Sequence, residues 1–357
     1  MRIKKICILG ITGSIGRQTI DIAKKLNFKI VGCSYYHNHQ LAKKIINNNN
    51  IKHVYCALNK NGSFNQLIKK CKPNLVVNAI VGMPGLKATL AAINNNVDIA
   101  LANKESLVVA GKFIFKLAKI KKINILPIDS EHSNLYNQLM HLNTNIINSI
   151  YITCSGGSFF DWTNKQKQTI NYKQATKHKN WLMGAKITID SNTLMNKCFE
   201  IVEAYWYFKT NRINVLLDKK SHMHSAVLTN DGSFYYSCSS PNMSNAIKLA
   251  LTNFKIDLEK KQQLLPTSSS YPVINNIKPI CWGYDIINDK TNSLGIIINC
   301  ANDVAHDLFV KCKIKFNQIL PLISWGIKNI RKHKIHSINE VFDFYNKIKN
   351  KIFLNWK

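Results

Sequence analysis

Short apolar runs alternate with amphipathic helical patterns over the first 125 residues, and no other feature of the sequence constrains the fold more. Six runs have the length and composition of buried strands: 4–10, 28–36, 51–58, 74–81, 97–103 and 123–129. Five stretches between them have helical periodicity: 17–26, 40–48, 64–71, 86–95 and 106–120. This alternation predicts a parallel sheet covered by helices on both faces, an α/β domain over residues 1–125.

The pattern changes after about residue 146. Three segments read as strands: 147–159, 186–191 and 224–239, the last with a hairpin-turn signal at Asn230-Asp231-Gly232. A long helix is expected from Thr193 to Phe208, and the C-terminal part is mostly helical, with an amphipathic segment at 339–356. We therefore predict an α+β domain over 126–260, a linker over 261–279 and a small helical domain over 280–357.

The formal net charge is +30, from 49 Lys+Arg against 19 Asp+Glu. Such a balance raises nucleic-acid binding as one alternative. Only four of the basic residues are arginines, which supply the bidentate contacts to guanine and phosphate, and the lysines are scattered among Asn and Ile. This composition is typical of an AT-rich, reduced bacterial genome. We therefore favour a solvated basic surface and no nucleic-acid partner.

The ten cysteines include no C-x-x-C pair, so neither a disulfide scaffold nor a zinc site is indicated. Several lie within apolar runs, as small buried residues do. No stretch approaches the roughly 18 to 20 apolar residues of a membrane-spanning helix. The sequence therefore predicts reduced thiols, a cytoplasmic location and no membrane partner.

A glycine loop, Gly10 to Gly16, follows the first predicted strand and opens the first predicted helix. A glycine turn at this place lets backbone amides approach a pyrophosphate at the helix N-terminus, which predicts a Rossmann-like dinucleotide site. The alternative is a simple tight turn. No carboxylate ends the second strand, where Tyr36, His37 and Asn38 stand instead. The missing carboxylate favours NADP(H) over NAD(H).

Acidic residues are scarce, which makes two groups of them informative. Asp129 and Glu131 follow an apolar strand and point the same way if the segment is extended. Asn196, Glu200 and Glu203 are spaced to share one face of a helix. Oxygen ligands of this kind suit Mg²⁺ or Mn²⁺ and not zinc. The alternative is a helix cap at Asp129 plus surface acids.

Two small-polar segments have the composition of phosphate-binding loops: 155–158 at a strand end, and 190–193 before the helix that carries Asn196 and Lys197. Taken singly, each is better explained as an ordinary turn or helix cap. Between them lies 178–184, with Trp181 and Gly184. This segment is either a lid that excludes water or a buried aromatic anchor.

Taken together, these segments resemble the 1-deoxy-D-xylulose 5-phosphate reductoisomerase family of the non-mevalonate isoprenoid pathway. The motifs that carry the resemblance lie in family order: LGITGSIGRQT, AIVGMPGL, LANKESLV, LPIDSEHSN, CSGGSF, HKNWLMGAKITIDSNTLMNKCFEIVEA and NCAND. They are long and unlike those of other dehydrogenases. The resemblance implies an N-terminal Rossmann-like NADPH domain, a catalytic and dimerisation domain and a homodimer.

The resemblance also implies residue roles. It assigns the cofactor to Thr12, Gly13, Ser14, Ile15, Asn38, Asn103, Glu105 and Gly184. It assigns Mg²⁺ or Mn²⁺ to Asp129, Glu131 and Glu200. It assigns a small phosphorylated sugar to Lys104, Ser130, Glu131, Ser155, His178, Ser191, Asn196, Lys197 and Glu200, with Trp181 in the lid. Lys104, Glu131 and Lys197 are the expected catalytic residues.

The implied reaction is NADPH- and metal-dependent rearrangement and reduction of 1-deoxy-D-xylulose 5-phosphate to 2-C-methyl-D-erythritol 4-phosphate. The sequence departs from the family at Tyr36-His37, Lys179, Cys198, 220–224 and Asn299-Cys300-Ala301-Asn302-Asp303. None of these changes removes an expected metal or phosphate ligand. The alternatives are another NADPH-dependent reductase on the same scaffold and a catalytically inactive or nucleic-acid-binding protein.

Overall fold

The computed structural model describes residues 4–58, 62–181, 183–255 and 270–356. The chain divides into two compact units. Unit 1 comprises the described residues within Met1–Ser106, Ile114–His141 and Asn242–Gln262, and unit 2 those within Leu107–Phe113, Leu142–Pro241 and Gln263–Lys357. The first nine residues of the expected linker 261–279 lie outside the described residues, and the expected domain boundaries stay predictions.

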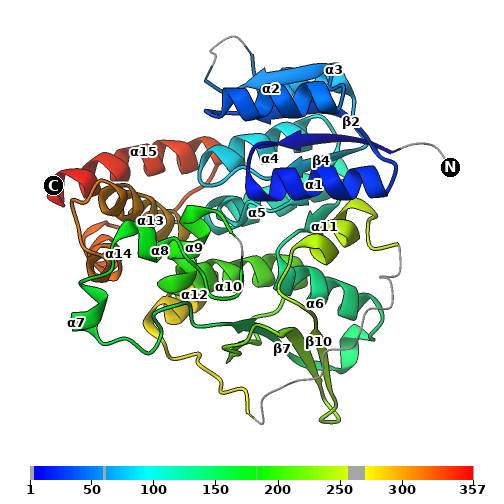
Figure 1. The fold of residues 1–357 in the computed structure, drawn as a ribbon. Helices are drawn as coiled ribbons and strands as arrows, with labels where there is room; N and C mark the ends of the chain where they lie inside the picture. The colour runs from blue at the N-terminus through cyan, green and yellow to red at the C-terminus, as the bar shows by residue number, and fades with distance from the viewer. Residues whose placement is uncertain (1–3, 59–61, 182, 256–269, 357) are drawn as a thin grey trace. The chain divides into compact units, whose positions relative to one another are not determined.

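Unit 1 contains a six-stranded sheet in the order β3-β2-β1-β4-β5-β6, and every pair of neighbouring strands is parallel (Figure 1). The strands are β1 (Lys5–Leu9), β2 (Lys29–Tyr35), β3 (His53–Cys56), β4 (Leu75–Asn78), β5 (Asp98–Leu101) and β6 (Ile125–Pro127). This is the doubly wound order, which confirms the predicted Rossmann-like sheet. Strand order reverses between β1 and β4, the place where such sheets bind ligands.

Helices connect the strands of unit 1: α1 (Ser14–Lys25), α2 (His39–Asn48), α3 (Phe64–Cys71), α4 (Pro84–Asn94), α5 (Lys104–Lys121) and α6 (Ser130–Met140). Helix α11 (Ser244–Leu251) returns to this unit from far along the chain and packs on α1 and α6. Its Ile247 and Leu251 share one buried cluster with Ile6, Ile8 and Ile20. The core of the unit therefore combines residues from both ends of its sequence.

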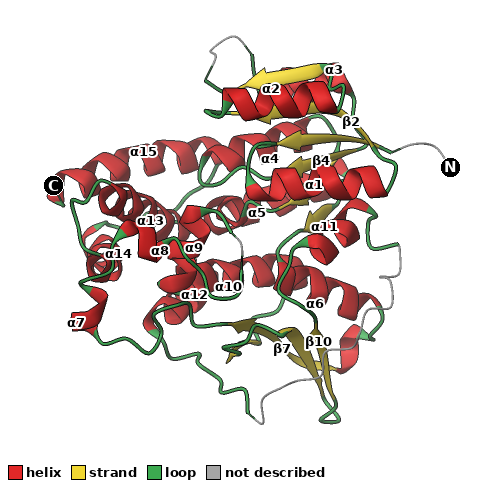
Figure 2. Ribbon diagram, viewed as in Figure 1, coloured by secondary structure: helices red, strands yellow, loops and turns green. Residues whose placement is uncertain are grey.

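Unit 2 contains a four-stranded mixed sheet in the order β10-β9-β7-β8 (Figure 2). Its strands are β7 (Ile147–Cys154), β8 (Ile213–Leu217), β9 (Met223–Thr229) and β10 (Phe234–Cys238). Strands β9 and β10 form the predicted hairpin, in which Gly232 has a φ of +86° and the Asp231 carboxylate accepts from the Ser233 amide at 3.0 Å. Among the described strands of this sheet, β7 and β8 pair in parallel and the other neighbours pair antiparallel.

The helices of unit 2 are α7 (Asn164–Lys167), α8 (Tyr172–Ala175), α9 (Ala185–Asn192), α10 (Met195–Phe208), α12 (Lys278–Ile287), α13 (Leu294–Val310), α14 (Ile319–Asn329) and α15 (Ile338–Asn355). Helix α10 packs along α12, and α13 packs against both α14 and α15. Close packing at Gly283 explains the first of these contacts, because a Cβ there would lie 2.8 Å from the Cys198 carbonyl oxygen. The predicted helical C-terminal region is present.

Two expectations about secondary structure were wrong. Residues 186–191 alternate like a strand but form most of α9, where Lys186 and Asp190 pair at i, i+4 across 2.8 Å. Tertiary and ionic contacts override the β preference of Ile187 and Ile189. The segment after Asp129 is also not extended, because α6 begins at Ser130. Within the described residues, no helix has the length and apolar character needed to cross a bilayer.

Candidate functional site

The glycine loop of unit 1 is sterically fixed. Gly10 has a φ of +88°, and a Cβ at Gly16 would lie 2.4 Å from the Gly10 carbonyl oxygen. The Gly10 and Ile11 amides donate to the Ser34 carbonyl at the end of β2, at 3.1 and 2.9 Å. Helix α1 starts at Ser14 after Gly13, with no side-chain cap. The helix N-terminus is therefore left for an anion, as the sequence predicts.

The end of β2 carries an exposed aromatic pair. The rings of Tyr36 and His37 lie 4.0 Å apart, and Tyr36 is 53% exposed. The Asn38 side chain accepts from the Leu41 amide at 3.2 Å and so caps α2. A carboxylate is absent at this strand end, so nothing there repels a 2′-phosphate.

Asn103 and Glu105 are buried at the start of α5, where Asn103 is the N-cap. Asn103 Nδ2 donates to the Gly82 carbonyl at 3.1 Å and to Glu105 Oε2 at 2.9 Å. Glu105 Oε1 accepts from the Gly82 amide at 3.0 Å. Together these side chains fix the loop after β4, beside the point where strand order reverses. Their predicted contact with the cofactor stays a prediction.

Lys104 and Asp129 meet at the carboxyl ends of β5 and β6, with Nζ 2.5 Å from Oδ2. The other Asp129 oxygen lies 3.1 Å from His132 Nδ1. Burial opposes ionisation, but the Lys104 ammonium and His132 hold the pKa of Asp129 well below its usual range. Sequence reasoning missed His132, although its i, i+3 spacing from Asp129 was a signal.

Asp129 occupies the N-cap position of α6, but its side chain makes no capping hydrogen bond. Glu131 lies in the first turn of that helix and is half-buried, and the Ser130 hydroxyl donates to its Oε2. The two carboxylates thus come from a helix start and not from an extended strand. Asp129 is kept as an anion, the form that a cation requires.

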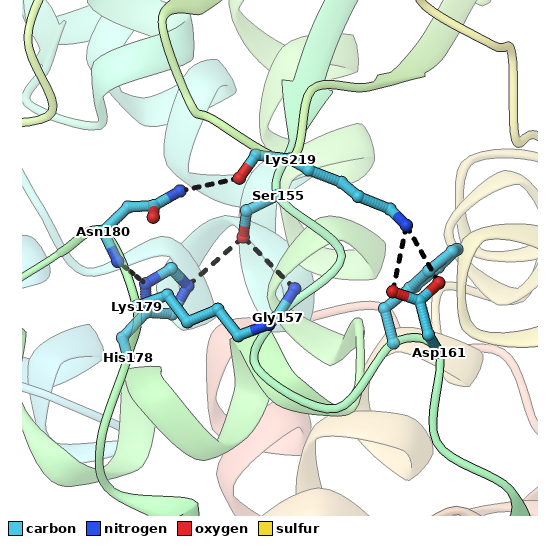
Figure 3. Close-up of a pocket in the computed structure, with 8 residues that line it drawn as sticks. Ser155, Gly157, Asp161, His178, Lys179, Asn180 and Lys219 are labelled. Atoms are coloured by element: carbon cyan, nitrogen blue, oxygen red, sulfur yellow. Dashed lines mark hydrogen bonds and ion pairs between the residues drawn. The ribbon is translucent and has the colours of Figure 1, made fainter.

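In unit 2, the loop after β7 places Ser155 beside His178 (Figure 3). Ser155 Oγ accepts from the Gly157 amide at 3.2 Å and lies 3.2 Å from His178 Nε2. Gly156 and Gly157 have φ values of +79° and +76°, a backbone conformation that residues with a side chain rarely adopt. The glycines therefore permit the turn that presents the Ser155 hydroxyl.

His178 is held as a neutral ring by its surroundings. Its Nδ1 accepts from the Asn180 and Trp181 amides at 3.1 and 3.2 Å, so the proton lies on Nε2. Nε2 is 3.2 Å from the Ser155 hydroxyl and 3.2 Å from the Ser191 hydroxyl. Burial, followed by the charge of Lys179, lowers the pKa of His178. One ring nitrogen thus joins the two serines that the resemblance assigns to phosphate.

A small cavity of about 30 Å³ opens between the Ser155 loop and the 178–180 segment (Figure 3). Asn180 Nδ2 donates to the Lys219 carbonyl at 3.0 Å and to the Ser221 hydroxyl at 2.9 Å. Lys219 Nζ is 2.9 Å from both Asp161 carboxylate oxygens. The cavity has room for about one water molecule. A larger anion would require His178 to move.

Ser191 lies in the last turn of α9, so the segment that the sequence places before the next helix is itself helical as far as Asn192. Leu194 has a φ of +63° and separates α9 from α10. Sequence reasoning missed a role for Asn192, whose Oδ1 accepts from the Ser158 amide at 2.6 Å and whose Nδ2 donates to the Ala175 carbonyl at 2.9 Å. Asn192 thus joins the two small-polar segments.

Helix α10 carries Asn196, Glu200 and Glu203, and Asn196 and Glu200 meet on one face as their i, i+4 spacing predicts. Asn196 Nδ2 donates to Glu200 Oε1 at 2.5 Å, and Lys197 pairs with Glu200 Oε2. Lys197 also donates to the Thr153 carbonyl at the end of β7. Lys197 and Glu200 are almost fully buried. Removing either side chain would leave the other charge buried without its partner, which is strongly destabilising.

The predicted lid segment contains Leu182, which lies outside the described residues. Trp181 packs edge-on against His224, with ring centroids 5.9 Å apart, and His224 Nε2 lies 2.9 Å from the Ser239 hydroxyl. Gly184 caps α9, and a Cβ there would meet no atom of the described residues within 4 Å. Trp181 is thus anchored on the sheet through His224.

The residues present fit the groups that the sequence implies. Unit 1 offers a glycine turn and an uncapped helix N-terminus to a pyrophosphate, and an ionised Asp129 with Glu131. Unit 2 offers the buried carboxylate of Glu200. Carboxylate oxygens are the donors that Mg²⁺ and Mn²⁺ prefer.

This fold and these side chains define a doubly wound nucleotide-binding enzyme with a second, mixed α/β unit. Family models for 1-deoxy-D-xylulose 5-phosphate reductoisomerase match residues 6–64 and 56–111, its C-terminal domain matches 125–208, and the DXP reductoisomerase C-terminal domain matches 238–351. The chain belongs to the 1-deoxy-D-xylulose 5-phosphate reductoisomerase family.

Relatives and solved structures agree with this assignment. The chain is 39% identical over 348 residues to the 1-deoxy-D-xylulose 5-phosphate reductoisomerase of Malacoplasma penetrans, covering 95% of this chain and 92% of the relative. It is 38% identical to that of Mycoplasmoides gallisepticum, covering 97% and 96%. A crystal structure of DOX-P reductoisomerase in complex with NADPH, fosmidomycin and magnesium matches with a TM-score of 0.86 at 27% identity, covering 99% and 98%. The Zymomonas mobilis enzyme in complex with NADPH matches with a TM-score of 0.83 at 25% identity, covering both chains fully.

Proposed function

We propose that this chain converts 1-deoxy-D-xylulose 5-phosphate to 2-C-methyl-D-erythritol 4-phosphate, using NADPH and Mg²⁺ or Mn²⁺. One observation carries the proposal in a chain of this family: the hydroxyls of Ser155 and Ser191 converge on a single nitrogen of His178. Two hydroxyls from separate segments that meet at one point have the arrangement of an anion subsite.

The substrate's phosphate is assigned to Ser155, Ser191 and Asn196, and Lys197 is assigned to the substrate as well. In the structure, His178 occupies the hydrogen-bonding positions of both serine hydroxyls. Phosphate would accept from the same hydroxyls, so its binding requires the imidazole to leave that position. The phosphate contacts lie away from the reacting carbons and supply binding energy for positioning.

The metal is assigned to Asp129 and Glu131 of unit 1 and Glu200 of unit 2. When bound, a divalent cation supplies Lewis acidity to the substrate oxygens. Asn196 and Lys197 fix the two oxygens of Glu200, and Lys104 keeps Asp129 ionised. These contacts orient the carboxylates before any cation arrives.

NADPH is assigned to Thr12, Gly13, Ser14 and Ile15 at the start of α1, with Asn38, Asn103, Glu105 and Gly184. The cofactor supplies the hydride. The chain contributes backbone amides at an uncapped helix N-terminus, which attract the pyrophosphate. Gly184, which carries no side chain, is assigned to the nicotinamide side of the cofactor.

During the reaction, Lys104 and Lys197 act as the ammonium groups that neutralise developing oxyanions on the substrate. Glu131 and Ser130 contact the reacting end of the sugar. Trp181 excludes water from the bound substrate. Its indole packs against His224, and this contact fixes the position of the ring. His178, with its proton on Nε2, donates that hydrogen bond to the phosphate after it leaves the serines.

The decisive experiment compares the wild-type chain with Glu200→Gln. NADPH consumption with 1-deoxy-D-xylulose 5-phosphate should require Mg²⁺ or Mn²⁺, and the variant should lose roughly a thousandfold in rate while still binding NADPH. Mn²⁺ should raise the melting temperature of the wild type and not of the variant. Glu340→Gln, which neutralises a half-buried carboxylate in the first turn of α15, is the control and should keep the wild-type rate. An unchanged rate in Glu200→Gln would refute the metal assignment.

We also propose that the enzyme is a homodimer that associates through the β10 edge and works in the cytoplasm. Three consecutive aromatic residues of this edge strand, Phe234, Tyr235 and Tyr236, are 43%, 45% and 43% exposed. An exposed aromatic edge strand is costly in water unless a partner covers it. All ten cysteines are free thiols, which suits a reducing compartment. Sedimentation should give twice the chain mass, and Tyr235→Lys should shift it toward one chain mass.

A further inference from the structure

The Asn-Cys-Ala-Asn-Asp motif, 299–303, stands out in the sequence, and the proposed function gives it no role. It lies in the middle of α13, where Asn299 is 0% and Asn302 is 1% exposed. Two fully buried amides on one helix need specific partners, because an unpaired buried polar group costs free energy. The partners of Asn302 lead directly to the proposed phosphate subsite.

Asn302 Nδ2 donates to Asp190 Oδ1 at 2.8 Å. The other Asp190 oxygen lies 2.8 Å from Lys186 Nζ, so both oxygens of this buried carboxylate are bound. Lys186 Nζ is also 3.5 Å from Asp303 Oδ1. The other Asp303 oxygen accepts from the Tyr345 hydroxyl at 2.7 Å. A buried polar network therefore joins the last turn of α9 to α13 and α15.

Ser191 lies between two anchored neighbours. Asp190 is tied to α13 through Asn302, and Asn192 is tied to the Ser158 amide and the Ala175 carbonyl. The Ser191 hydroxyl is left to face His178 Nε2 at 3.2 Å. Ser191 is thus held between two neighbours whose side chains are fixed.

We propose that Asn302 is a positioning residue of the phosphate subsite: by holding Asp190 it fixes the turn of α9 that presents the Ser191 hydroxyl. The proposal rests on the proposed function, in which Ser191 binds the substrate's phosphate. Without Asn302, one oxygen of a buried carboxylate loses its donor. Asp190 must then shift toward another donor, and Ser191 follows it along the backbone. Binding subsites tolerate little displacement, since a misplacement of about 1 Å can lower the reaction rate as much as a hundredfold.

The test compares Asn302→Ala with Asn299→Ala, a matched control. Both substitutions remove a fully buried amide from α13, but Asn299 contacts Asp303 at 3.4 Å and not Asp190. Both should lower the melting temperature. Only Asn302→Ala should raise the KM for 1-deoxy-D-xylulose 5-phosphate, by about tenfold, with kcat changed less than about twofold. The same variant should need about tenfold more inorganic phosphate for the same rise in melting temperature.

An equal rise in KM for both variants would overturn the proposal, since the effect would then not be specific to the contact between Asn302 and Asp190. An exchange of partners gives a second test, which applies even where Asn302→Ala does not fold. Asn302→Asp alone places two carboxylates across the 2.8 Å contact and should raise KM more than the alanine does. Adding Asp190→Asn restores a donor and an acceptor and should return KM toward the wild-type value.

A double variant whose KM stays as high as that of Asn302→Asp alone would also overturn the proposal. Ser191→Ala separates this inference from the proposed function. If Ser191→Ala leaves KM and phosphate affinity unchanged, the assignment of phosphate to Ser191 fails, whatever Asn302 does. If Ser191→Ala weakens phosphate while Asn302→Ala behaves like Asn299→Ala, only the positioning role fails.

Discussion

Two glycine turns, each following a strand, present the proposed ligand sites of the two units, and they do so by different means. In unit 1 the loop from Gly10 to Gly16 offers backbone amides. Its shape is set by close backbone contact, because a Cβ added at Gly16 would lie 2.4 Å from the Gly10 carbonyl oxygen. In unit 2 the turn at Gly156 and Gly157 offers a hydroxyl, Ser155, whose partners come from distant segments.

The difference decides what each site depends on. A backbone site needs only a local sequence pattern and does not titrate, because amides carry no ionisable group. A side-chain site depends on several elements being held in register and on the protonation state of His178. Ligand binding in unit 1 should therefore be lost through substitutions that clash with the backbone. Ligand binding in unit 2 should be lost when a single polar side-chain atom is removed or when the pH changes the protonation of His178.

The largest effect in this comparison is expected for Gly16→Ala. The added Cβ would lie 2.8 Å from the Ile11 Cα and closer still to the Gly10 carbonyl oxygen, and neither atom belongs to a flexible side chain. The turn must open, which should cost about 1 to 3 kcal/mol of stability and weaken NADPH binding by roughly a hundredfold. Thermal unfolding and fluorescence titration with NADPH measure the two effects.

Gly184→Ala is the control for the stability effect alone, because its Cβ would meet no atom of the described residues within 4 Å and its φ of −66° suits any residue. It should change the melting temperature little. Comparable destabilisation by both alanines would mean that the glycine loop is not sterically fixed.

A smaller effect is expected for Ser191→Ala in unit 2. It removes one hydroxyl from the phosphate subsite and leaves the backbone free to keep its shape. A hydrogen bond to a charged group is worth roughly 1.5 to 3 kcal/mol, so the KM for substrate should rise about tenfold or more. Steady-state kinetics check this, with NADPH affinity as the internal reference. A matching loss of NADPH affinity would contradict the separation of the two sites.

The smallest effect concerns pH. Burial, with Lys179, lowers the pKa of His178 below the value of about 6.5 that it has when unfolded. The unfolded chain then binds the proton more readily, so the contribution of His178 to stability is complete above about pH 6.5 and is lost as the pH falls through the folded pKa. The melting temperature should therefore fall less steeply with acidification in His178→Gln than in the wild type.

His306→Gln is the comparison for this measurement, since burial lowers the pKa of His306 as well, while its Nε2 has no hydrogen-bond partner among the described residues. Phosphate distinguishes the two histidines. Adding phosphate should reduce the part of the acid-induced fall in melting temperature that His178 causes, because the imidazole then leaves the serines. Phosphate should not change the part that His306 causes. A phosphate effect on both would refute the displacement of His178.

Local patterns in the sequence predicted much of this fold because they arise from local physics. The parallel sheet follows from short apolar runs and helical periodicity, and the helix with Asn196 and Glu200 follows from i, i+4 spacing. Strand β8 and helix α11 were missed, since a short apolar segment does not reveal which sheet or helix will cover it. Helix α9 was mistaken for a strand because the ion pair that favours the helix depends on burial.

The candidate site was predictable in part for the same reason. Residue types and motif order indicated Ser155, Ser191 and Glu200, and the structure shows Ser155 and Ser191 meeting at His178. The pairing of Asp190 with Asn302 joins residues 112 positions apart, and no periodicity connects them. Contacts of this range depend on the folded arrangement of α9 and α13, so single-sequence reasoning could not find them.

The return of α11 to unit 1 has a consequence for how the chain acquires its structure. Lys4 donates to the Leu251 carbonyl at 2.6 Å, which closes a loop of 247 residues, and Ile247 and Leu251 are completely buried in the core that begins with Ile6. A growing chain on the ribosome cannot complete the core of its first domain until about residue 251 has emerged. Folding of the N-terminal sheet therefore depends on a non-local contact, which slows folding. The apolar side of α1 stays uncovered until α11 has been synthesised.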